Sequence, residues 1–497
     1  MFDGTLRQGL SAQLEQTPFL QMISGDQIAQ TLRFMEKPPD TRLTPEVARE
    51  VCQRVNATTE IEGSIAALGS QYVIGLSAVN CHTGESLAQE QVTAAGKEKV
   101  LTALGGTASE LRSKLGESPA SLENFDVPLY QATTSSLEAL QAWTLGTQSL
   151  SKGDSPSAIS FLQRAVSLDP NFAEAYSTLG VTYGFVGQLG LAAENTRKAY
   201  DLRERTSEHE KFSIISNYCF WATGDMEKAV QIAEQWAKLY PRDTPAYFSL
   251  TSAYQGAGRN DEWLAAAREA LRLDPTPFAY NAVASGYVTL GRLDEARATI
   301  QQAEKNHIDP AAFRGMLYGI AFMQNDSPTM DRQLTAPWIF SPPWMLNSPS
   351  AADEAQSWTA AYDGHLHHAR ELTERAIASA RQQGANGLAA DLDVGGGVIE
   401  ALFGNFPEAR EAVKDAGDLS TADHDLEGVA GIVWAVAGDA QQARKLAGDL
   451  NKRFPEATYI RFGALPAIQG LLALHRGEPT DATKALDAIS SYELVPP

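Results

Sequence analysis

The sequence predicts a mainly α-helical solenoid preceded by a small, partial α/β domain. The first observation is a repeat. Two amphipathic runs fill residues 137–170, and Gly146 and Gly153 within them both recur 34 residues later. A fixed period of this length is typical of stacked helix–turn–helix units. The second observation is that residues 1 to about 125 lack the repeat and carry a β-hairpin pattern instead.

The composition is that of a globular, acidic protein. Of the 497 residues, 43% are hydrophobic and 20% are charged, so the chain can bury a core. The net charge of −21 repels phosphate backbones, which argues against a nucleic-acid partner, although acidity by itself also serves solubility. No apolar run reaches the roughly 18–20 residues that cross a bilayer. Residues 1–4 lack a basic start and an apolar core, so we expect neither membrane insertion by this chain nor a signal peptide.

The non-repeating region alternates helical and strand patterns. Apolar residues at helical spacing predict helices, whereas short apolar or alternating runs between turn residues predict strands. In chain order we expect a helix at 5–15, a short strand at 19–23, helices at 26–35 and 44–55, strands at 60–68, 72–80 and 86–92, and a closing helix at 97–115. The short turns between the last three strands indicate an antiparallel arrangement.

Three stretches between residues 2 and 115 carry a family resemblance. They read FDGTLRQGLSAQLEQTPFLQMIS, LTPEVAREVCQR and EGSIAALGSQYVIGLSAVNCHTGESLA, and they resemble the TolB-like α/β domain. That domain occurs in the presumed extracytoplasmic C-terminal half of certain bacterial serine/threonine protein kinases, ahead of a tetratricopeptide array. The resemblance implies that this chain is the non-catalytic sensor part of such a kinase.

The chain departs from that family at its start. The family domain begins with a further strand and loop ahead of the segment that matches residues 2–6, so this chain holds either a truncated domain or a fragment of a longer protein. A missing strand would expose a sheet edge, through which the chain could self-associate.

The three cysteines bear on location. Cys52 and Cys81 both lie in the N-terminal region and can pair, whereas Cys219 falls in a repeat helix, where a buried thiol is expected. No Cys-x-x-Cys pair is present, which argues against a structural zinc site. A disulfide would favour an oxidising compartment. We expect an extracytoplasmic location if the chain is part of a membrane-tethered kinase, and a cytoplasmic one if it is free-standing.

The array is marked by a turn glycine and, five residues later, by a small residue in the second helix. Glycine suits the turn because the chain leaves a helix there through a left-handed residue. Asn325 replaces the glycine once, and Trp263 and Met330 replace the small residue. The regular positions are Gly153, Gly187, Gly224, Gly258, Gly291, Gly364, Gly404, Gly438 and Gly477 for the turn, and Ala158, Ala192, Ala229, Ala296, Ala369, Ala409, Ala443 and Ala482 for the second helix.

This pattern resembles the tetratricopeptide repeat, with Tyr176, Leu179, Gly180 and Tyr183 at matching positions of one unit. About ten units are expected, regular to about residue 305 and degenerate afterwards. The insertion between the two sets of repeats either lies on the solenoid or serves as a docking loop. The expected organisation is a TolB-like domain at 1–118, a linker at 119–134, regular repeats at 135–335, a Pro/Trp-rich insertion at 336–350 and degenerate repeats at 351–491.

No motif indicates catalysis. His365 and His368 lie one helical turn apart, but no third ligand at a metal-binding spacing is visible. Residues 391–397 (DLDVGGG) lack the later acidic ligand of a calcium loop and the Gly-Lys-Ser/Thr of a phosphate loop, so helix-packing glycines are expected there. The kinase catalytic loop, the Asp-Phe-Gly motif and the glycine loop are all missing. We therefore expect a non-enzyme without cofactor or metal.

Binding of a protein or an extended peptide is the expected function. In a stack of helix pairs the first helices line the concave face, and the inner stripe is aromatic and polar, which suits aromatic anchors. The alternative that half of these aromatic residues form inter-repeat core stays open. The expected groove residues are Trp143, Thr147, Ser177, Phe185, Tyr218, Trp221, Phe248, Ser252, Asn281 and Ser285.

Three other functions remain open. The chain can be a free-standing adaptor, or an assembly protein that self-associates through the N-terminal sheet edge. The third is a metal-dependent enzyme with a site between the two domains or at His365 and His368.

Overall fold

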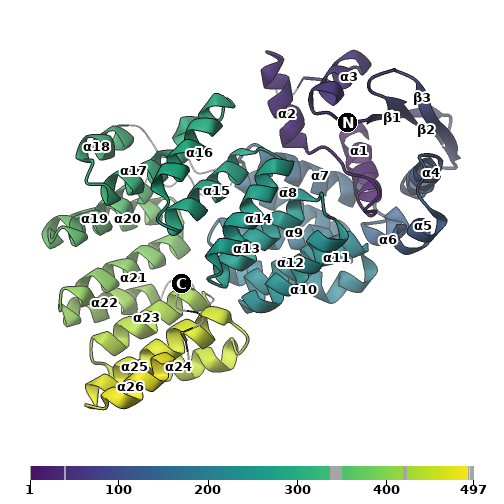
Figure 1. Ribbon diagram of the computed structural model, residues 1–497. Coiled ribbons are helices and arrows are strands. Elements are labelled where there is room, and N and C mark those ends of the chain that lie inside the picture. The colour runs from purple at the N-terminus through teal and green to yellow at the C-terminus, as the bar shows by residue number, and fades with distance from the viewer. Residues whose placement is uncertain are drawn as a thin grey trace.

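A computed structural model describes residues 2–38, 41–335, 338, 350–417, 423–487, 489–490 and 492. The N-terminal part lies at one end of a long helical array (Figure 1). Apart from Trp338 and Ser350, the predicted insertion at 336–350 lies outside the described residues. The N-terminal elements are α1 (Phe2–Leu14), α2 (Gly25–Phe34), α3 (Pro45–Arg54), β1 (Thr59–Leu68), β2 (Gln71–Asn80), β3 (Ser86–Ala94), α4 (Val100–Lys114), α5 (Pro119–Phe125) and α6 (Leu129–Ala132).

The three strands form one antiparallel sheet in the order β1-β2-β3, as expected from the turns. Ile74, Leu76 and Ala78 alternate along β2 and are buried on the face that α4 covers. The predicted strand at 19–23 is wrong, because these residues form no strand ladder. An apolar run needs a pairing partner to become a strand; here Leu20 and Met22 pack on the core from an irregular segment.

Helices α7–α26 form ten successive pairs, which confirms the predicted helix–turn–helix solenoid. The pairs are α7 (Leu137–Ser151) with α8 (Ser155–Leu168), α9 (Ala173–Phe185) with α10 (Leu189–Leu202), α11 (Glu208–Tyr218) with α12 (Met226–Leu239), α13 (Thr244–Gly256) with α14 (Asn260–Leu273), α15 (Pro277–Thr289) with α16 (Leu293–Lys305), α17 (Arg314–Met323) with α18 (Ser327–Leu334), α19 (Ser350–Tyr362) with α20 (Leu366–Gln382), α21 (Asn386–Leu402) with α22 (Phe406–Gly417), α23 (His424–Val436) with α24 (Ala440–Arg453), and α25 (Leu465–His475) with α26 (Pro479–Asp487).

The two sequence markers of the repeat do what was predicted of them. All nine turn glycines have positive φ, between 67° and 81°, and Asn325 has φ 57°. Each small residue of the second helix is buried, with at most 3% of its surface exposed. Gly180 shows why the first helix also needs a small residue. A Cβ atom there would lie 3.0 Å from the carbonyl oxygen of Ala192, so the two helix backbones touch.

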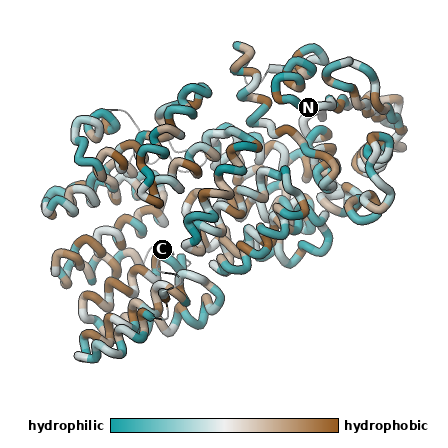
Figure 2. Tube along the Cα trace, in the orientation of Figure 1, coloured by the Kyte–Doolittle hydropathy of each residue, from teal (hydrophilic) through white to brown (hydrophobic). Residues whose placement is uncertain are grey.

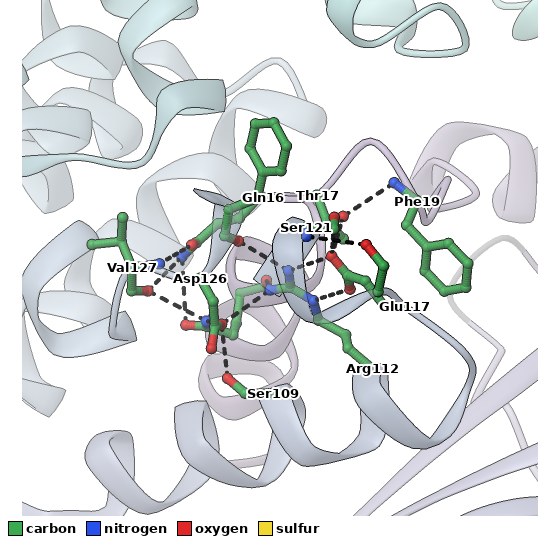
Figure 3. A network of polar contacts seen from close by, with 12 residues as sticks. Gln16, Thr17, Phe19, Ser109, Arg112, Glu117, Ser121, Asp126 and Val127 are labelled. Carbon is green, nitrogen blue, oxygen red and sulfur yellow. Dashed lines mark hydrogen bonds and ion pairs between the residues drawn. The ribbon is translucent and has the colours of Figure 1, made fainter. Parts of the chain in front are cut away.

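The segment expected as a linker is ordered around a buried arginine. It contains α5 and α6, and Arg112 of α4 reaches into it with a fully buried guanidinium (Figure 3). Arg112 donates to both carboxylate oxygens of Glu117 at 2.7 and 2.9 Å, and to Asp126 at 3.1 Å. The carbonyls of Gln13 and Phe125 accept its remaining two bonds. All five donors of the guanidinium are therefore used.

Gln16 and Thr17, just after α1, extend this polar network. The Gln16 side chain makes two bonds with the backbone of Val127, at 2.9 and 3.0 Å, and Thr17 donates to Glu117 at 2.7 Å. Burial raises the pKa of Glu117, but bonds from Arg112, Ser121 and Thr17 outweigh it and hold the pKa below its usual value. The network fixes α1, α4 and α5 as one unit.

One apolar core runs from this unit into the array without a break. It joins α1 and β2 to α4, and continues through α7 and α8 to α9 and α10. In Figure 2, hydrophobic and hydrophilic stretches alternate along the helices of the N-terminal unit and of the array. None of the described helices combines the length and hydropathy that a bilayer crossing requires. The N-terminal unit and the first repeats therefore share their core.

The N-terminal unit also contacts later repeats along their side. The Tyr240 hydroxyl, just after α12, bonds to the Gln16 carbonyl, and the ring of Phe34 in α2 lies 5.4 Å from His307, just after α16. Both contacts use the ends of second helices. The segment from α1 to α2 thus runs along one edge of the solenoid.

The array bends far enough for distant repeats to touch. The backbone N–H of Thr458 donates to the carbonyl of Gly224 at 2.9 Å, and the Thr458 hydroxyl accepts from the N–H of Met226 at 3.0 Å. A second contact brings Gly387 against Gly187, so closely that a Cβ on Gly387 would lie 2.5 Å from the Gly187 oxygen. The second and third pairs therefore meet the eighth and tenth.

Candidate binding groove

The first helices of successive pairs form the inner wall of the curved array. α9 packs on α11, α11 on α13, α19 on α21 and α21 on α23, whereas comparable packing does not join consecutive second helices among the described residues. The more closely spaced helices lie on the inside of a bend. The concave face is therefore made by the first helices, as in other helical solenoids.

The two tryptophans expected in the groove pack between repeats. Trp143 is buried, its ring lies 5.6 Å from Phe172, and its indole N–H donates to Thr178 of the next pair at 3.1 Å. Trp221 covers Gly184, where a Cβ would lie 2.4 Å from the indole, and its ring meets Phe185 at 5.7 Å. Both indoles join neighbouring units; Trp143 is buried and Trp221 is half-buried.

The other aromatic residues of the predicted stripe are half-buried. Tyr218 stacks on Tyr200 of α10 with ring centroids 4.1 Å apart, which turns it toward a second helix. Phe248 meets Phe278 edge-on at 4.7 Å across two consecutive first helices. Phe248 therefore lies on the inner wall with a neighbouring ring of its own.

The polar residues of the stripe mostly bond within the chain. Ser177 is buried and accepts from Asn217 of the next first helix at 3.0 Å. Ser285 donates to Asn281 at 3.3 Å, and Thr147 to its own helix. Ser252 is half-buried. The structure thus places the predicted residues along the first helices, while many of their contacts are made within the array.

The second half of the array offers a more open inner stripe, which the sequence analysis missed. Glu354, Trp358 and Tyr362 lie four residues apart on α19, and 40% of Trp358 and 82% of Tyr362 are exposed. On α21, the exposed Asp391 precedes Leu402, which is 76% exposed. Such side chains on consecutive first helices form an apolar and acidic surface.

A simple signal could have found these residues. Glu354 lies ten residues before the turn glycine Gly364, just as the expected groove residue Phe248 lies ten before Gly258. The irregular sequence of the later repeats hid this register. Counting back from each turn glycine, instead of matching repeat motifs, would have placed Glu354 in the groove.

Glu354 and Trp358 line a shallow pocket between α19, α20 and α21. Gly395 opens it, because a Cβ there would lie only 3.6 Å from the indole of Trp358. The lining residues are Glu354, Ser357, Trp358, Thr373, Leu392, Gly395, Gly396 and Ile399. An acidic and an aromatic side chain thus meet at one depression.

Two carboxyl groups, those of Glu354 and Asp391, lie beside this pocket. Desolvation raises the pKa of Glu354. Asp391 is solvent-accessible but flanked by protein, and lost hydration, followed by the charges of Asp423 and Glu354, raises its pKa. Among the described residues, no Lys or Arg forms an ion pair with Glu354 or Asp391. A cation bound beside these two carboxyl groups would therefore favour their ionised forms.

A second acidic group lies where the N-terminal unit meets the second and third pairs. Desolvation raises the pKa of Glu15 to about 7, that of Glu174 to about 8 and that of Glu210 to about 6. Desolvation lowers the pKa of His209, but a 2.8 Å hydrogen bond to Asp243 and the charge of that residue outweigh it, so the pKa is raised. The protonation of these side chains is therefore coupled to the contact between the N-terminal unit and the array.

The other residues singled out in the sequence lie at exposed, helix-packing or disulfide positions. His365 and His368 are exposed at the start of α20, and the described residues contain no group of three His, Cys, Asp or Glu placed to hold a metal. Residues 391–397 lie inside α21, where Gly397 packs against α22. Cys52 and Cys81 form a disulfide, with Cα atoms 6.0 Å apart, while burial raises the pKa of the Cys219 thiol to about 12.

Comparison with known proteins finds one matching repeat and several solved structures that resemble part of the chain. Residues 244–277, covering α13 and α14, match the tetratricopeptide repeat family. TTC0263, a thermophilic tetratricopeptide protein of Thermus thermophilus, is 21% identical over 39% of this chain and 96% of its own, with a TM-score of 0.27. MamA is 24% identical over 34% and 91%, with a TM-score of 0.24, and PilF of Pseudomonas aeruginosa is 18% identical over 39% and 88%, with a TM-score of 0.29. No curated protein matches the chain.

Proposed function

We propose that this protein is a scaffold that binds a protein or peptide on the concave face of its tetratricopeptide-like array. The observation that carries the proposal is the exposed stripe of Trp358, Tyr362 and Leu402 on two consecutive first helices. Large apolar side chains that stay exposed on a concave surface mark interaction sites more often than isolated ones do. Phe248 and Ser252 lie on the earlier first helix α13, and both are half-buried.

A photo-crosslinker at the groove tests this proposal. Dodecapeptides selected from a random phage library on the full chain are the probe, with benzoylphenylalanine placed at Tyr362 on the inner wall. The matched control places it at Arg375 on α20, whose side chain is 64% exposed. Crosslinks at position 362 and not at 375 support a groove ligand. Selection of no peptide, or equal crosslinking at both positions, would contradict it.

Within this scaffold role, we propose that the chain is the non-catalytic sensor part of a bacterial serine/threonine kinase signalling protein. The support is the resemblance of residues 2–115 to the TolB-like domain. The Cys52–Cys81 disulfide adds to it, since such bonds persist in oxidising compartments. Sequencing the gene upstream tests the proposal: a kinase domain in the same reading frame supports it, and a stop codon directly before Met1 favours a free-standing adaptor.

Self-association is the second candidate function, and the geometry of β1 favours it. β1 is an edge strand, and most of its residues from Gly63 to Leu68 are exposed, with Leu68 at 65%. An exposed edge is a template for pairing with another chain. Sedimentation at increasing protein concentration checks this: a mass that stays that of one chain at high concentration argues against it.

A further inference from the structure

The pocket between α19 and α21 has a chemistry that selects for one kind of side chain. Glu354 supplies a carboxyl group, and Trp358 supplies a large aromatic side chain that is 40% exposed to solvent. A Lys or Arg side chain satisfies both, because its apolar stem packs on the ring while its charge meets the carboxylate. An acidic or purely apolar side chain would leave Glu354 unbalanced.

The residues around the pocket also favour a Lys or Arg side chain. Asp391 lies on α21, four residues before Gly395, which faces the Trp358 indole. The nearby basic residues are already engaged, since Arg375 pairs with Asp353 at 2.7 Å and Arg381 with Asp393 at 3.0 Å. Glu354 and Asp391 thus remain as two carboxylates on consecutive first helices without a described cationic partner.

Apolar anchors continue the surface beyond the charges. Tyr362 lies two helical turns after Glu354, and Leu402 occupies the corresponding end of α21. Both are exposed by more than three quarters. A segment crossing this wall meets acidic groups near the helix starts and apolar groups near the helix ends.

We infer that this part of the groove binds an extended protein segment in which basic and apolar residues are combined, with a Lys or Arg side chain lying against Trp358 beside Glu354. The inference rests on the scaffold function proposed above and names the chemistry of its partner. Charge complementarity selects this occupant, because no Lys or Arg in the described part of the chain pairs with Glu354 or Asp391.

The test must separate local recognition from general attraction, since a net charge of −21 draws in any cation. The probes are dodecapeptides selected on the full chain from a random phage library. Each is labelled with fluorescein and compared with a version in which citrulline replaces Arg and acetyl-lysine replaces Lys. The groove variant is Glu354→Gln with Asp391→Asn. The matched control, Glu374→Gln with Asp415→Asn, removes the same charge from exposed positions on the second helices of the same two pairs.

We expect basic peptides to be enriched and to lose at least tenfold in affinity when neutralised. They should also lose at least tenfold on the groove variant and less than twofold on the control. Trp358→Ala should weaken them in the same way, with thermal unfolding as the check that the variants stay folded. Selected peptides that are neutral or acidic, or that respond equally to both double variants, would overturn the inference and leave the scaffold function standing. Selection of no peptide would overturn both.

Discussion

The hydroxyl of Tyr240 donates a hydrogen bond to the backbone carbonyl of Gln16, 224 residues earlier in the chain, and the two oxygens lie 2.7 Å apart. Tyr240 directly follows α12 of the third helix pair, whereas Gln16 follows α1. The ring of Phe125 packs edge-on against that of Tyr240 at 6.3 Å. The N-terminal unit is therefore held to the side of the solenoid as well as to its beginning.

Replacing Tyr240 by Phe should loosen this attachment. The change removes one buried hydrogen bond and should lower the free energy of unfolding by about 1 kcal/mol, or up to about 3 if the Gln16 carbonyl stays without a partner. Urea unfolding and hydrogen exchange at residues 15–24 measure the effect. Tyr247→Phe is the control, because the Tyr247 hydroxyl bonds to Pro241 at 3.2 Å in an exposed position. Equal effects of the two variants would argue against the attachment.

Arg112 should be among the most sensitive positions of the chain. Its replacement by Met leaves the carboxylate of Glu117 buried without its main partner, which costs roughly 3–5 kcal/mol. The double variant with Glu117→Met should recover much of that loss, because no charge is then buried alone. Arg54→Met is the control, since Arg54 pairs with Glu50 at the surface and such pairs contribute about 1 kcal/mol or less. A double variant as unstable as Arg112→Met would contradict this account.

Stability should fall as the pH rises from about 4.5 to 8. The folded-state pKa values of Glu15, Glu174 and Glu210 lie above the ordinary value of 4.5, and that of His209 lies above 6.5. The folded chain therefore binds more protons than the unfolded chain in this range. The contribution of each group to the free energy of unfolding is fully present at low pH and is lost as the pH rises through the folded-state pKa of that group. We expect a loss of roughly 2 kcal/mol or more between pH 5 and 8, measured by urea unfolding.

Glu15→Gln separates this effect from the rest of the pH dependence. Gln does not titrate, so the variant should match the parent near pH 5 and exceed its stability at pH 8 by about 1–2 kcal/mol. Glu110→Gln, at an exposed position of α4, should leave the pH profile unchanged. If the free energies of unfolding of Glu15→Gln and the parent changed in parallel with pH, the prediction would be wrong.

Two glycines of first helices should respond to alanine in opposite directions. At Gly180 a Cβ would lie 2.7 Å from Thr196 and 3.0 Å from the Ala192 oxygen, so the helices must move apart at a cost of about 1–3 kcal/mol. At Gly319 no atom lies within 4 Å of the added Cβ, and Ala should stabilise α17 by about 0.5–1 kcal/mol. Thermal unfolding of the two variants gives the comparison, and a stabilised Gly180→Ala would be the contrary result.

Local rules were sufficient to predict the array from the sequence. The turn glycines and the alanines of the second helices act within one unit, so their spacing alone predicts the pairs, and the positive φ values confirm it. Three strands and the closing helix of the N-terminal unit also follow from short patterns. The same rules predicted a strand at 19–23 wrongly, because pairing depends on a partner elsewhere in the chain.

The surface of the groove was harder to predict than the fold. Trp143 and Trp221 have the register of groove residues, but a neighbouring Phe172 or Gly184 decides that they are packed. Glu354 has the register of Trp143, ten residues before the turn glycine, in a unit whose sequence no longer resembles the others. Whether such a side chain is packed or exposed cannot be predicted from the sequence of its own repeat, because it depends on the side chains of the next helix.

The contact between Gly224 and Thr458 bears on how the chain unfolds. A solenoid whose units touch only their neighbours melts from its ends, one unit after another, and folds quickly through local contacts. Thr458 is also hydrogen-bonded to Met226, 232 positions earlier, so the last pair is held by the third pair as well as by the ninth. The terminal unit then cannot fray freely, and closing so long a loop slows folding. We therefore expect the repeats to unfold together in one cooperative transition, and not one after another from the ends.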